Sequence, residues 1–260
     1  MIQVHPQKYP DYIPFAQACN CGSVYPLSIA QGYQYGSIYT NSAEHPQTAL
    51  FHHACGFAFL SGAYDEAFLT SVYPMFLSQN NPIRRFILLT DDARIRTFFQ
   101  AKDCLQIEQR YFFEYRQDIT NHTEDLPKDY LLKPIDDTVF PLIQGGITPY
   151  FSWKSAEEFL TNGMGYCVVC GGDAAAWAFS AAISHEEVDI GVETKEPYRR
   201  KGLAAAAATA MVHEILKQNK KPVWACHAQN IGSAKLAQQI GFVKTAQCDV
   251  IRRKVINKSL

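Results

Sequence analysis

The sequence predicts an α/β fold with a mixed (α+β) sheet, built as two successive parts. Three features support this prediction. Short apolar runs alternate with amphipathic segments through the first half of the 260 residues. In the second half, Gly171-Gly172-Asp173 separates two apolar runs, which is typical of an antiparallel hairpin. The apolar strand Val188–Val192 is then followed by a short polar stretch and an alanine-rich helix.

The first half is predicted to alternate between strands and helices. In order, we expect a buried apolar element at Ala49–Leu60, a helix at Glu66–Leu77, a strand at Arg84–Thr90, a helix at Ala93–Ala101 and a strand at Ile107–Tyr115. The polar, acidic segment Gln117–Lys128 then predicts an exposed connection. We therefore expect an N-terminal α/β subdomain of unknown role at residues 1–126 and a second domain at residues 127–260.

The second half is predicted to hold six strands and four helices. Ser155 and Glu158 form a capping box, which favours a helix start at this point. In order, the expected elements are a strand at Tyr130–Ile135, short helices at Asp137–Ile143 and Ser155–Leu160, strands at Tyr166–Cys170, Ala174–Ser184 and Val188–Val192, the alanine-rich helix, a strand at Pro222–His227, a helix at Ala234–Ile240 and a strand at Gln247–Val255.

Composition excludes several classes of function. The formal net charge is −1, without the basic excess that binding to a phosphate backbone needs, so we expect no nucleic-acid partner. The longest apolar run, Leu203–Val212, is far shorter than the roughly 20 residues of a membrane span. Residues 1–14 lack a basic region followed by an apolar stretch, so no secretory signal is visible. We expect no membrane segment and a cytoplasmic location.

The eight cysteines are expected to be reduced thiols, because a chain of this size without an export signal usually keeps them so. One group offers the chemistry of a zinc site, two imidazoles with nearby thiols: Cys19, Cys21, His52, His53 and Cys55. Neither of its spacings matches a standard zinc finger. We therefore expect no metal.

The turn after the Val188–Val192 strand has the composition of an anion site. It reads Arg199-Arg200-Lys201-Gly202-Leu203-Ala204 and opens the alanine-rich helix. The first turn of a helix carries unpaired backbone N–H groups and partial positive charge. The glycine and alanine keep bulk away from that backbone, and the three cations add whole charges. This pattern favours a pyrophosphate ligand.

A second group of residues follows the Pro222–His227 strand. Asn230 and Ser233 begin a short helix that closes with Gly241-Phe242. Together with the loop at residues 199–204, in this order, they resemble the cofactor-binding half of the GNAT N-acetyltransferase superfamily. The resemblance covers the chain well from about residue 129 onward and implies a GNAT acyltransferase fold for residues 127–260.

Further segments are similar to the GNAT subfamily related to zwittermicin A resistance acetyltransferase. They are Trp153-Lys-Ser155, Glu158-Phe159-Leu160, Gly163-Met-Gly-Tyr-Cys167, Asp189-Ile-Gly-Val-Glu-Thr194, Tyr198-Arg-Arg-Lys-Gly-Leu-Ala204 and Val223-Trp-Ala-Cys-His227. This likeness points to an amine-bearing antibiotic or metabolite as the acceptor.

The resemblance implies a function and a cofactor site. It implies acetyl transfer from acetyl-CoA to a primary amine of a small molecule, by direct attack of the amine. Backbone groups of Val192 and Thr194 would hold the pantetheine arm, and Asn230 or Ser233 would touch that arm. The pyrophosphate would bind the loop that contains Arg199, Arg200, Lys201, Gly202, Leu203 and Ala204.

The amine must lose a proton, so a base is expected near the acetyl end. Glu193 is the first choice and His227 the second. Many GNAT enzymes also carry a tyrosine acid in the last helix, where this chain has Ala237. A thiolate leaves readily without such help, given a thiol pKa of about 8.5.

Two other readings compete with the enzyme. One is a non-catalytic acyl-CoA sensor on a degenerate GNAT fold, which the missing tyrosine allows. The other is a different nucleotide enzyme or a hydrolase, which the absence of Gly-x-Gly-x-x-Gly, Gly-x-x-x-x-Gly-Lys-Ser/Thr and Gly-x-Ser-x-Gly disfavours. A homodimer is compatible with the sequence, which carries no sign of oligomeric state.

Overall fold

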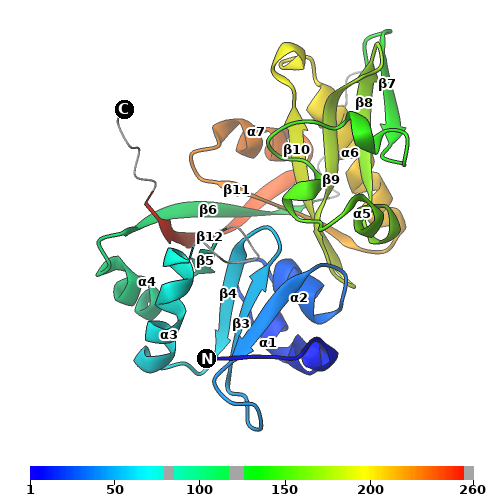
Figure 1. Cartoon of the computed structure of the whole chain (residues 1–260). Coiled ribbons are helices and arrows are strands. Elements are labelled where there is room, and N and C mark those ends of the chain that lie inside the picture. The colour runs from blue at the N-terminus through cyan, green and yellow to red at the C-terminus, as the bar shows by residue number, and fades with distance from the viewer. Residues whose placement is uncertain (79–84, 117–125, 255–260) are drawn as a thin grey trace. The chain divides into compact units, whose positions relative to one another are not determined.

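A computed structural model describes residues 1–78, 85–116 and 126–254, and it confirms the predicted α/β class with a mixed sheet (Figure 1). The chain forms two compact units. Unit 1 comprises Met1–Arg110 with Gln247–Leu260, and unit 2 comprises Tyr111–Ala246. The division at residues 126 and 127 stays a prediction. Residues 117–125 of the predicted connection lie outside the described residues.

Unit 1 carries a sheet in the order β1-β2-β3-β4-β5-β12-β6. Its neighbours are antiparallel from β1 to β4, whereas β4 and β5 are parallel. The elements in this part of the chain are β1 (Ile2–Gln3), the 3-10 helix η1 (Pro6–Tyr12), α1 (Ile13–Gln17), α2 (Val24–Ala30), β2 (Gly36–Thr40), β3 (Thr48–His53), β4 (Phe57–Gly62), α3 (Glu66–Leu77), β5 (Ile87–Thr90), α4 (Ala93–Gln100) and β6 (Leu105–Tyr115).

The predicted helices of the first half are confirmed as α3 and α4, and each starts at an aspartate. The Asp65 carboxylate accepts from Phe68 N at 2.8 Å, and the Asp92 carboxylate accepts from Arg94 N at 2.8 Å. The single apolar element at Ala49–Leu60 is wrong, because β3 and β4 form a hairpin there. The strand predicted from Arg84 begins at Ile87, and Arg84 lies outside the described residues.

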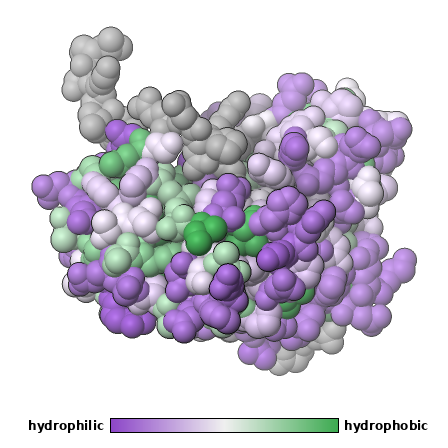
Figure 2. Space-filling view, turned by 60° about the horizontal axis from the view of Figure 1, so that its bottom comes forward, coloured by the Kyte–Doolittle hydropathy of each residue, from purple (hydrophilic) through white to green (hydrophobic). Residues whose placement is uncertain are grey.

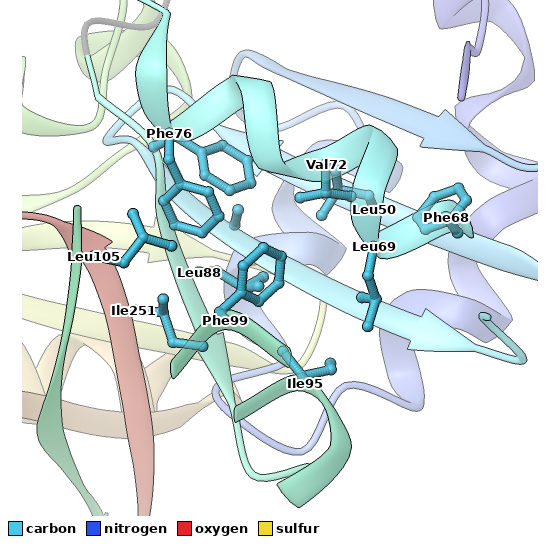
Figure 3. Packing of buried hydrophobic residues seen from close by; sticks show 12 residues of the cluster. Leu50, Phe68, Leu69, Val72, Phe76, Leu88, Ile95, Phe99, Leu105 and Ile251 are labelled. Atoms are coloured by element: carbon cyan, nitrogen blue, oxygen red, sulfur yellow. The ribbon is translucent and has the colours of Figure 1, made fainter. Parts of the chain in front are cut away.

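The core of unit 1 gathers side chains from helices and strands that are far apart in the sequence (Figure 3). Ile251 of β12 is fully buried beside residues of the first half. The C-terminal strand therefore completes this core. The cluster comprises Leu50, Ala58, Phe68, Leu69, Val72, Phe76, Phe86, Leu88, Ile95, Phe99, Leu105 and Ile251.

Unit 2 has the strand order β12-β6-β11-β10-β9-β8-β7. The strands β10 and β11 are parallel, and β7 to β10 are antiparallel. Its elements are β7 (Tyr130–Pro134), the 3-10 helices η2 (Phe140–Leu142) and η3 (Pro149–Phe151), α5 (Ala156–Asn162), β8 (Gly165–Cys170), β9 (Asp173–Ile183), β10 (Glu187–Thr194), the 3-10 helix η4 (Glu196–Tyr198), α6 (Leu203–Lys217), β11 (Lys221–His227), α7 (Ile231–Gln239) and β12 (Phe242–Arg253).

Most predicted elements of the second half are confirmed in kind. The hairpin turn has φ of +57° at Gly171 and +89° at Gly172, a backbone that favours glycine at both positions. Ser155 caps α5 by accepting from Glu158 N at 3.1 Å. The helix predicted at Asp137–Ile143 is only the short 3-10 turn η2. The last strand starts five residues before the predicted Gln247, and Val255 lies outside the described residues.

The alanine-rich helix α6 packs on the strands of unit 2 (Figure 1). Ala207 and Ala208 of the helix are fully buried, as are Ala176 and Ala178 of β9. Small residues on both surfaces let the helix axis approach the sheet closely. This contact fixes where the first turn of α6 lies relative to β10.

One series of elements occurs twice along the chain, which the sequence did not reveal. Three antiparallel strands are followed by a helix, a strand parallel to the third, a second helix and a last strand. The first series runs from β2 to β6, and the second from β8 to β12. The last strands are exchanged, because β12 pairs with β5 while β6 lies next to β11.

In the described part of the chain, no helix is both long and apolar enough to cross a membrane. Figure 2 shows a face on which hydrophilic side chains are widespread and strongly hydrophobic ones are confined to small spots. Some large apolar residues are exposed, which is ordinary for a folded chain.

Candidate functional site

The two parallel strands of unit 2 separate after three paired residues. Glu187 pairs with Lys221, Val188 with Pro222 and Asp189 with Val223. Among the described residues no pairing of these strands continues beyond this point, although β10 runs on to Thr194 and β11 to His227. The two strands thus form the arms of a V, with residues 190–194 on the β10 arm and residues 224–227 on the β11 arm.

The loop from β10 to α6 has an unusual backbone. Arg200 has φ +62° and Gly202 has φ +73°, so two residues of a four-residue turn are left-handed. Alternating hands of this kind turn successive N–H groups toward one point, which makes an anion-binding concavity. A Cβ added at Gly202 would meet nothing within 4 Å, so the turn lies open.

The first turn of α6 lacks a side-chain cap. Gly202 is its N-cap, whereas Asp65, Asp92, Ser155 and Asn230 each place an oxygen on the first turn of α3, α4, α5 and α7. The N–H groups at the start of α6 therefore have no side-chain acceptor from the N-cap residue. Among the described helices that are longer than eight residues and connect two strands, only α6 has an N-cap residue without a side-chain acceptor. Its first turn is therefore open to an outside anion.

Three cations surround this helix start. Arg199, Arg200 and Lys201 are exposed, and in the described part of the chain none of them has a carboxylate partner within ion-pair distance. Arg199 Nε donates to Thr194 O at 3.4 Å. Lys201 Nζ donates to the Tyr130 hydroxyl at 2.9 Å, and this bond raises the pKa of Lys201. The positive charge is thus uncompensated.

Asn230 and Ser233 already serve α7. Asn230 Oδ1 accepts from Ser233 N at 3.1 Å, so it caps the helix as the sequence pattern allows. Ser233 Oγ accepts from Trp224 Nε1 at 3.0 Å, and the Trp224 side chain is almost fully buried. Both residues lie beside the β11 arm of the V, with local roles in addition to the predicted one.

The carboxylate of Glu193 is engaged by a backbone turn. Its Oε1 accepts from Gly146 N at 3.1 Å, and its Oε2 accepts from Ile147 N at 2.5 Å. The neighbouring strand adds a third contact, because Trp177 Nε1 donates to Ile147 O at 2.8 Å. The sequence showed only a glycine pair at Gly145 and Gly146, and nothing in it signalled contact with a strand about fifty residues away.

His227 and Ala237 complete the set of predicted positions. The last pair between β10 and β11 is Asp189 with Val223. His227 lies four residues after this pair on β11, and Glu193 lies four residues after it on β10. Its Nδ1 accepts from Gln229 N at 3.3 Å. Ala237, the position considered in the sequence for a tyrosine acid, is fully buried in α7. Val192 and Thr194 lie on the β10 arm, and Leu203 and Ala204 open α6.

Unit 1 has hollows at the corresponding helix start, but their lining is acidic. One of about 510 Å³ is lined by Tyr64, Asp65, Glu66 and Arg94 among others. Arg94 pairs with Asp92 at 2.7 Å, and this bond holds the pKa of the Asp92 carboxyl well below its usual range. A pyrophosphate would meet carboxylates there, so the open loop of unit 2 is the stronger anion site.

The residues considered for zinc lie in unit 1. His53 Nδ1 is 3.2 Å from Cys55 Sγ, and burial lowers the pKa of His53 to about 3 and that of His52 to about 4. Burial also raises the pKa of the Cys19 thiol to about 12. Among the described residues, no group of three or more His, Cys, Asp or Glu side chains is placed to hold a metal ion.

Comparisons with known proteins bear on the family and the fold of the chain. Residues 23–250 match the model of the family described as GNAT acetyltransferase. An uncharacterized N-acetyltransferase, YdfB of Bacillus subtilis, is 25% identical over 80% of this chain and 81% of its own length. A GCN5-related N-acetyltransferase-like protein from Streptococcus suis has a TM-score of 0.75 at 20% identity, covering 96% of this chain and 100% of that one. A tandem GNAT protein from the clavulanic acid biosynthesis pathway has a TM-score of 0.64 at 10% identity, covering 97% of both chains.

Proposed function

The chain belongs to the GNAT acetyltransferase family, and we propose that it moves an acetyl group from acetyl-CoA to a primary amine of a small molecule. The observation that carries this proposal is the loop at residues 199–204. It combines an uncapped helix start, two left-handed residues and three cations without carboxylate partners among the described residues. These features fit a pyrophosphate, which bears negative charge and many acceptor oxygens.

The cofactor arm would lie in the V between β10 and β11. Backbone groups of Val192 and Thr194 would hold the pantetheine, with Asn230 and Ser233 at the opposite arm. Arg199, Arg200 and Lys201 would bind the phosphates, with the backbone amides from Arg200 to Ala204. A fixed backbone N–H at the thioester oxygen typically contributes a few kcal/mol to catalysis. Bound acetyl-CoA supplies the activated acyl group.

In the proposed reaction the amine nitrogen attacks the acetyl carbon. The new C–N bond forms, the C–S bond breaks, the nitrogen loses a proton and the thiolate of coenzyme A gains one. Much of the acceleration comes from holding the two reactants in register. A base at the end of one arm takes the proton, directly or through water, and Glu193 and His227, at matching positions on the two arms, are the two candidates for it.

The likeness to the subfamily related to zwittermicin A resistance favours an amine-bearing antibiotic or metabolite. A panel of benzylamine, 1,3-diaminopropane, glucosamine and glycinamide covers aromatic, aliphatic, sugar and amide-bearing amines. Release of coenzyme A from acetyl-CoA, followed as free thiol, would show acetylation of at least one of them above the rate without amine.

The buried Ala237 favours a second candidate function. A GNAT fold without an acid for the leaving thiolate suits a sensor that binds acyl-CoA without turnover. Acetyl-CoA binding together with no thiol release from any amine of the panel would support the sensor over the enzyme.

A further inference from the structure

The turn at Gly145–Ile147 is held against β10 and β9 by three hydrogen bonds. Two come from its own amides to the two oxygens of Glu193, at 3.1 and 2.5 Å. The third is donated by Trp177 Nε1 to Ile147 O at 2.8 Å. Glu193 and Trp177 are directly opposite each other on β10 and β9. This one pair of residues therefore binds both the amide N–H groups and a carbonyl oxygen of the turn.

The same contact leaves no room for a side chain at Gly145. A Cβ added to Gly145 would lie 2.5 Å from Glu193 Oε2 and 2.9 Å from Trp177 Cζ2, so the carboxylate or the indole would have to move. A Cβ added to Gly146 would lie 3.7 Å from Glu193 Oε1, an ordinary contact. Neither glycine has positive φ, so both positions accept the backbone of alanine. The two glycines therefore form a matched pair.

The position of the turn connects it to the site. Glu193 lies between Val192 and Thr194, in the part of β10 that has separated from β11. The turn that it holds thus stands beside the arm proposed for the pantetheine. Both oxygens of Glu193 face backbone donors of the turn, which suits an anchor.

We infer that Glu193 is a positioning residue that holds the Gly145–Ile147 turn as a fixed wall for the acceptor amine. This inference deepens the proposed function and rests on it for the identity of the acceptor. The proton then leaves through water or His227. Loss of Glu193 would weaken acceptor binding through the turn and leave the pH dependence of the chemical step in place.

The first test needs no activity. Hydrogen exchange measured by mass spectrometry follows the peptide containing residues 144–148 in the wild type and in Glu193→Ala, Glu193→Gln, Gly145→Ala and Gly146→Ala. We expect about tenfold or faster exchange in Glu193→Ala and Gly145→Ala, as for loss of a hydrogen bond to a charged group, and wild-type exchange in Gly146→Ala. Equal protection in the wild type and both Glu193 variants would overturn the inference. Glu193→Gln keeps one acceptor, so it tests the anchor even where the alanine variant does not fold.

The second test uses the amine of the panel that is acetylated fastest. For a positioning role, Gly145→Ala and Glu193→Gln both raise KM for that amine, and kcat keeps its wild-type pH profile. If Glu193→Gln instead loses about 100-fold or more in kcat together with the acidic limb of the profile, while Gly145→Ala is unaffected, Glu193 is the base and the inference is wrong. Should no amine react, the proposed function fails, and the exchange experiment alone still decides whether Glu193 anchors the turn.

Discussion

His52 and His53 are buried side by side in β3, and their burial makes the chain sensitive to acid. In the folded chain their pKa values fall to about 4 and about 3, whereas an unfolded histidine has a pKa of about 6.5. Between these values the unfolded chain binds more protons. The free energy of unfolding is therefore highest above pH 6.5 and decreases as the pH falls toward 4, by up to about 1.4 kcal/mol per pH unit for each histidine.

Denaturant unfolding between pH 4 and 7 checks this prediction. His52→Gln keeps a side-chain amide for the bond to Arg85 O and removes one titrating group, so its stability should change less steeply with pH. His213→Gln on the exposed surface of α6 is the control and should follow the wild type. Parallel curves for His52→Gln and wild type would contradict the prediction.

Ser233 illustrates a residue whose local contact is separable from its proposed role. Ser233→Ala leaves the buried indole N–H of Trp224 without its acceptor, which should lower the free energy of unfolding by about 1 to 3 kcal/mol. Thermal or denaturant unfolding measures this loss. An equal loss in a Trp224→Phe variant, with no further loss in the double variant, would show that the two changes remove one interaction.

At the scale of single elements, the close packing of α6 on the sheet depends on its alanine residues. Ala207 is fully buried, so Ala207→Leu should overpack the contact and cost about 1 to 3 kcal/mol of unfolding free energy. Ala210 is only partly buried, so Ala210→Leu should cost less. Denaturant unfolding of both variants compares them. Equal stability of the two leucine variants would contradict the prediction, because it would show that the small size of Ala207 is not needed for α6 to pack closely on the sheet.

The elements also show where sequence patterns are informative. The caps at Asp65 and Ser155 and the turn at Gly171-Gly172 are local, so α3, α5 and the β8–β9 hairpin were predictable. The β3–β4 hairpin was missed because its strands are almost wholly buried and show no alternation. The residues of the loop proposed for the pyrophosphate are contiguous, so a local pattern was enough to propose it, whereas the anchor of Glu193 joins positions 46 and 47 residues apart.

At the scale of the whole molecule, the repeated series of elements does not imply a repeated cofactor site. In both units the parallel pair separates after three residues. In unit 1, however, Asp65 caps the following helix and Glu66 opens it, where unit 2 has Gly202 and three cations. Acidic side chains at that helix start repel phosphate. We therefore expect one acetyl-CoA per chain, and calorimetry giving two sites of similar affinity would contradict this.

The exchange of last strands between the two series was beyond sequence reasoning. β12 pairs with β5 through Asp249 to Arg252, and Ile251 is buried in the core of unit 1. Such pairing depends on long-range contacts that leave no local pattern. It also places the chain's C-terminal strand in the core formed largely by its first half.

The most direct test of the central claim is calorimetric titration of acetyl-CoA into the wild type, Gly202→Glu and Gly32→Glu. Gly32 has φ +76° and open surroundings, as Gly202 has φ +73°, so the two variants share the backbone strain and differ in place. The account predicts binding to the wild type and to Gly32→Glu, and affinity at least about tenfold weaker in Gly202→Glu because a carboxylate opposes the pyrophosphate. Absence of binding to the wild type, or equal binding to both variants, would contradict it.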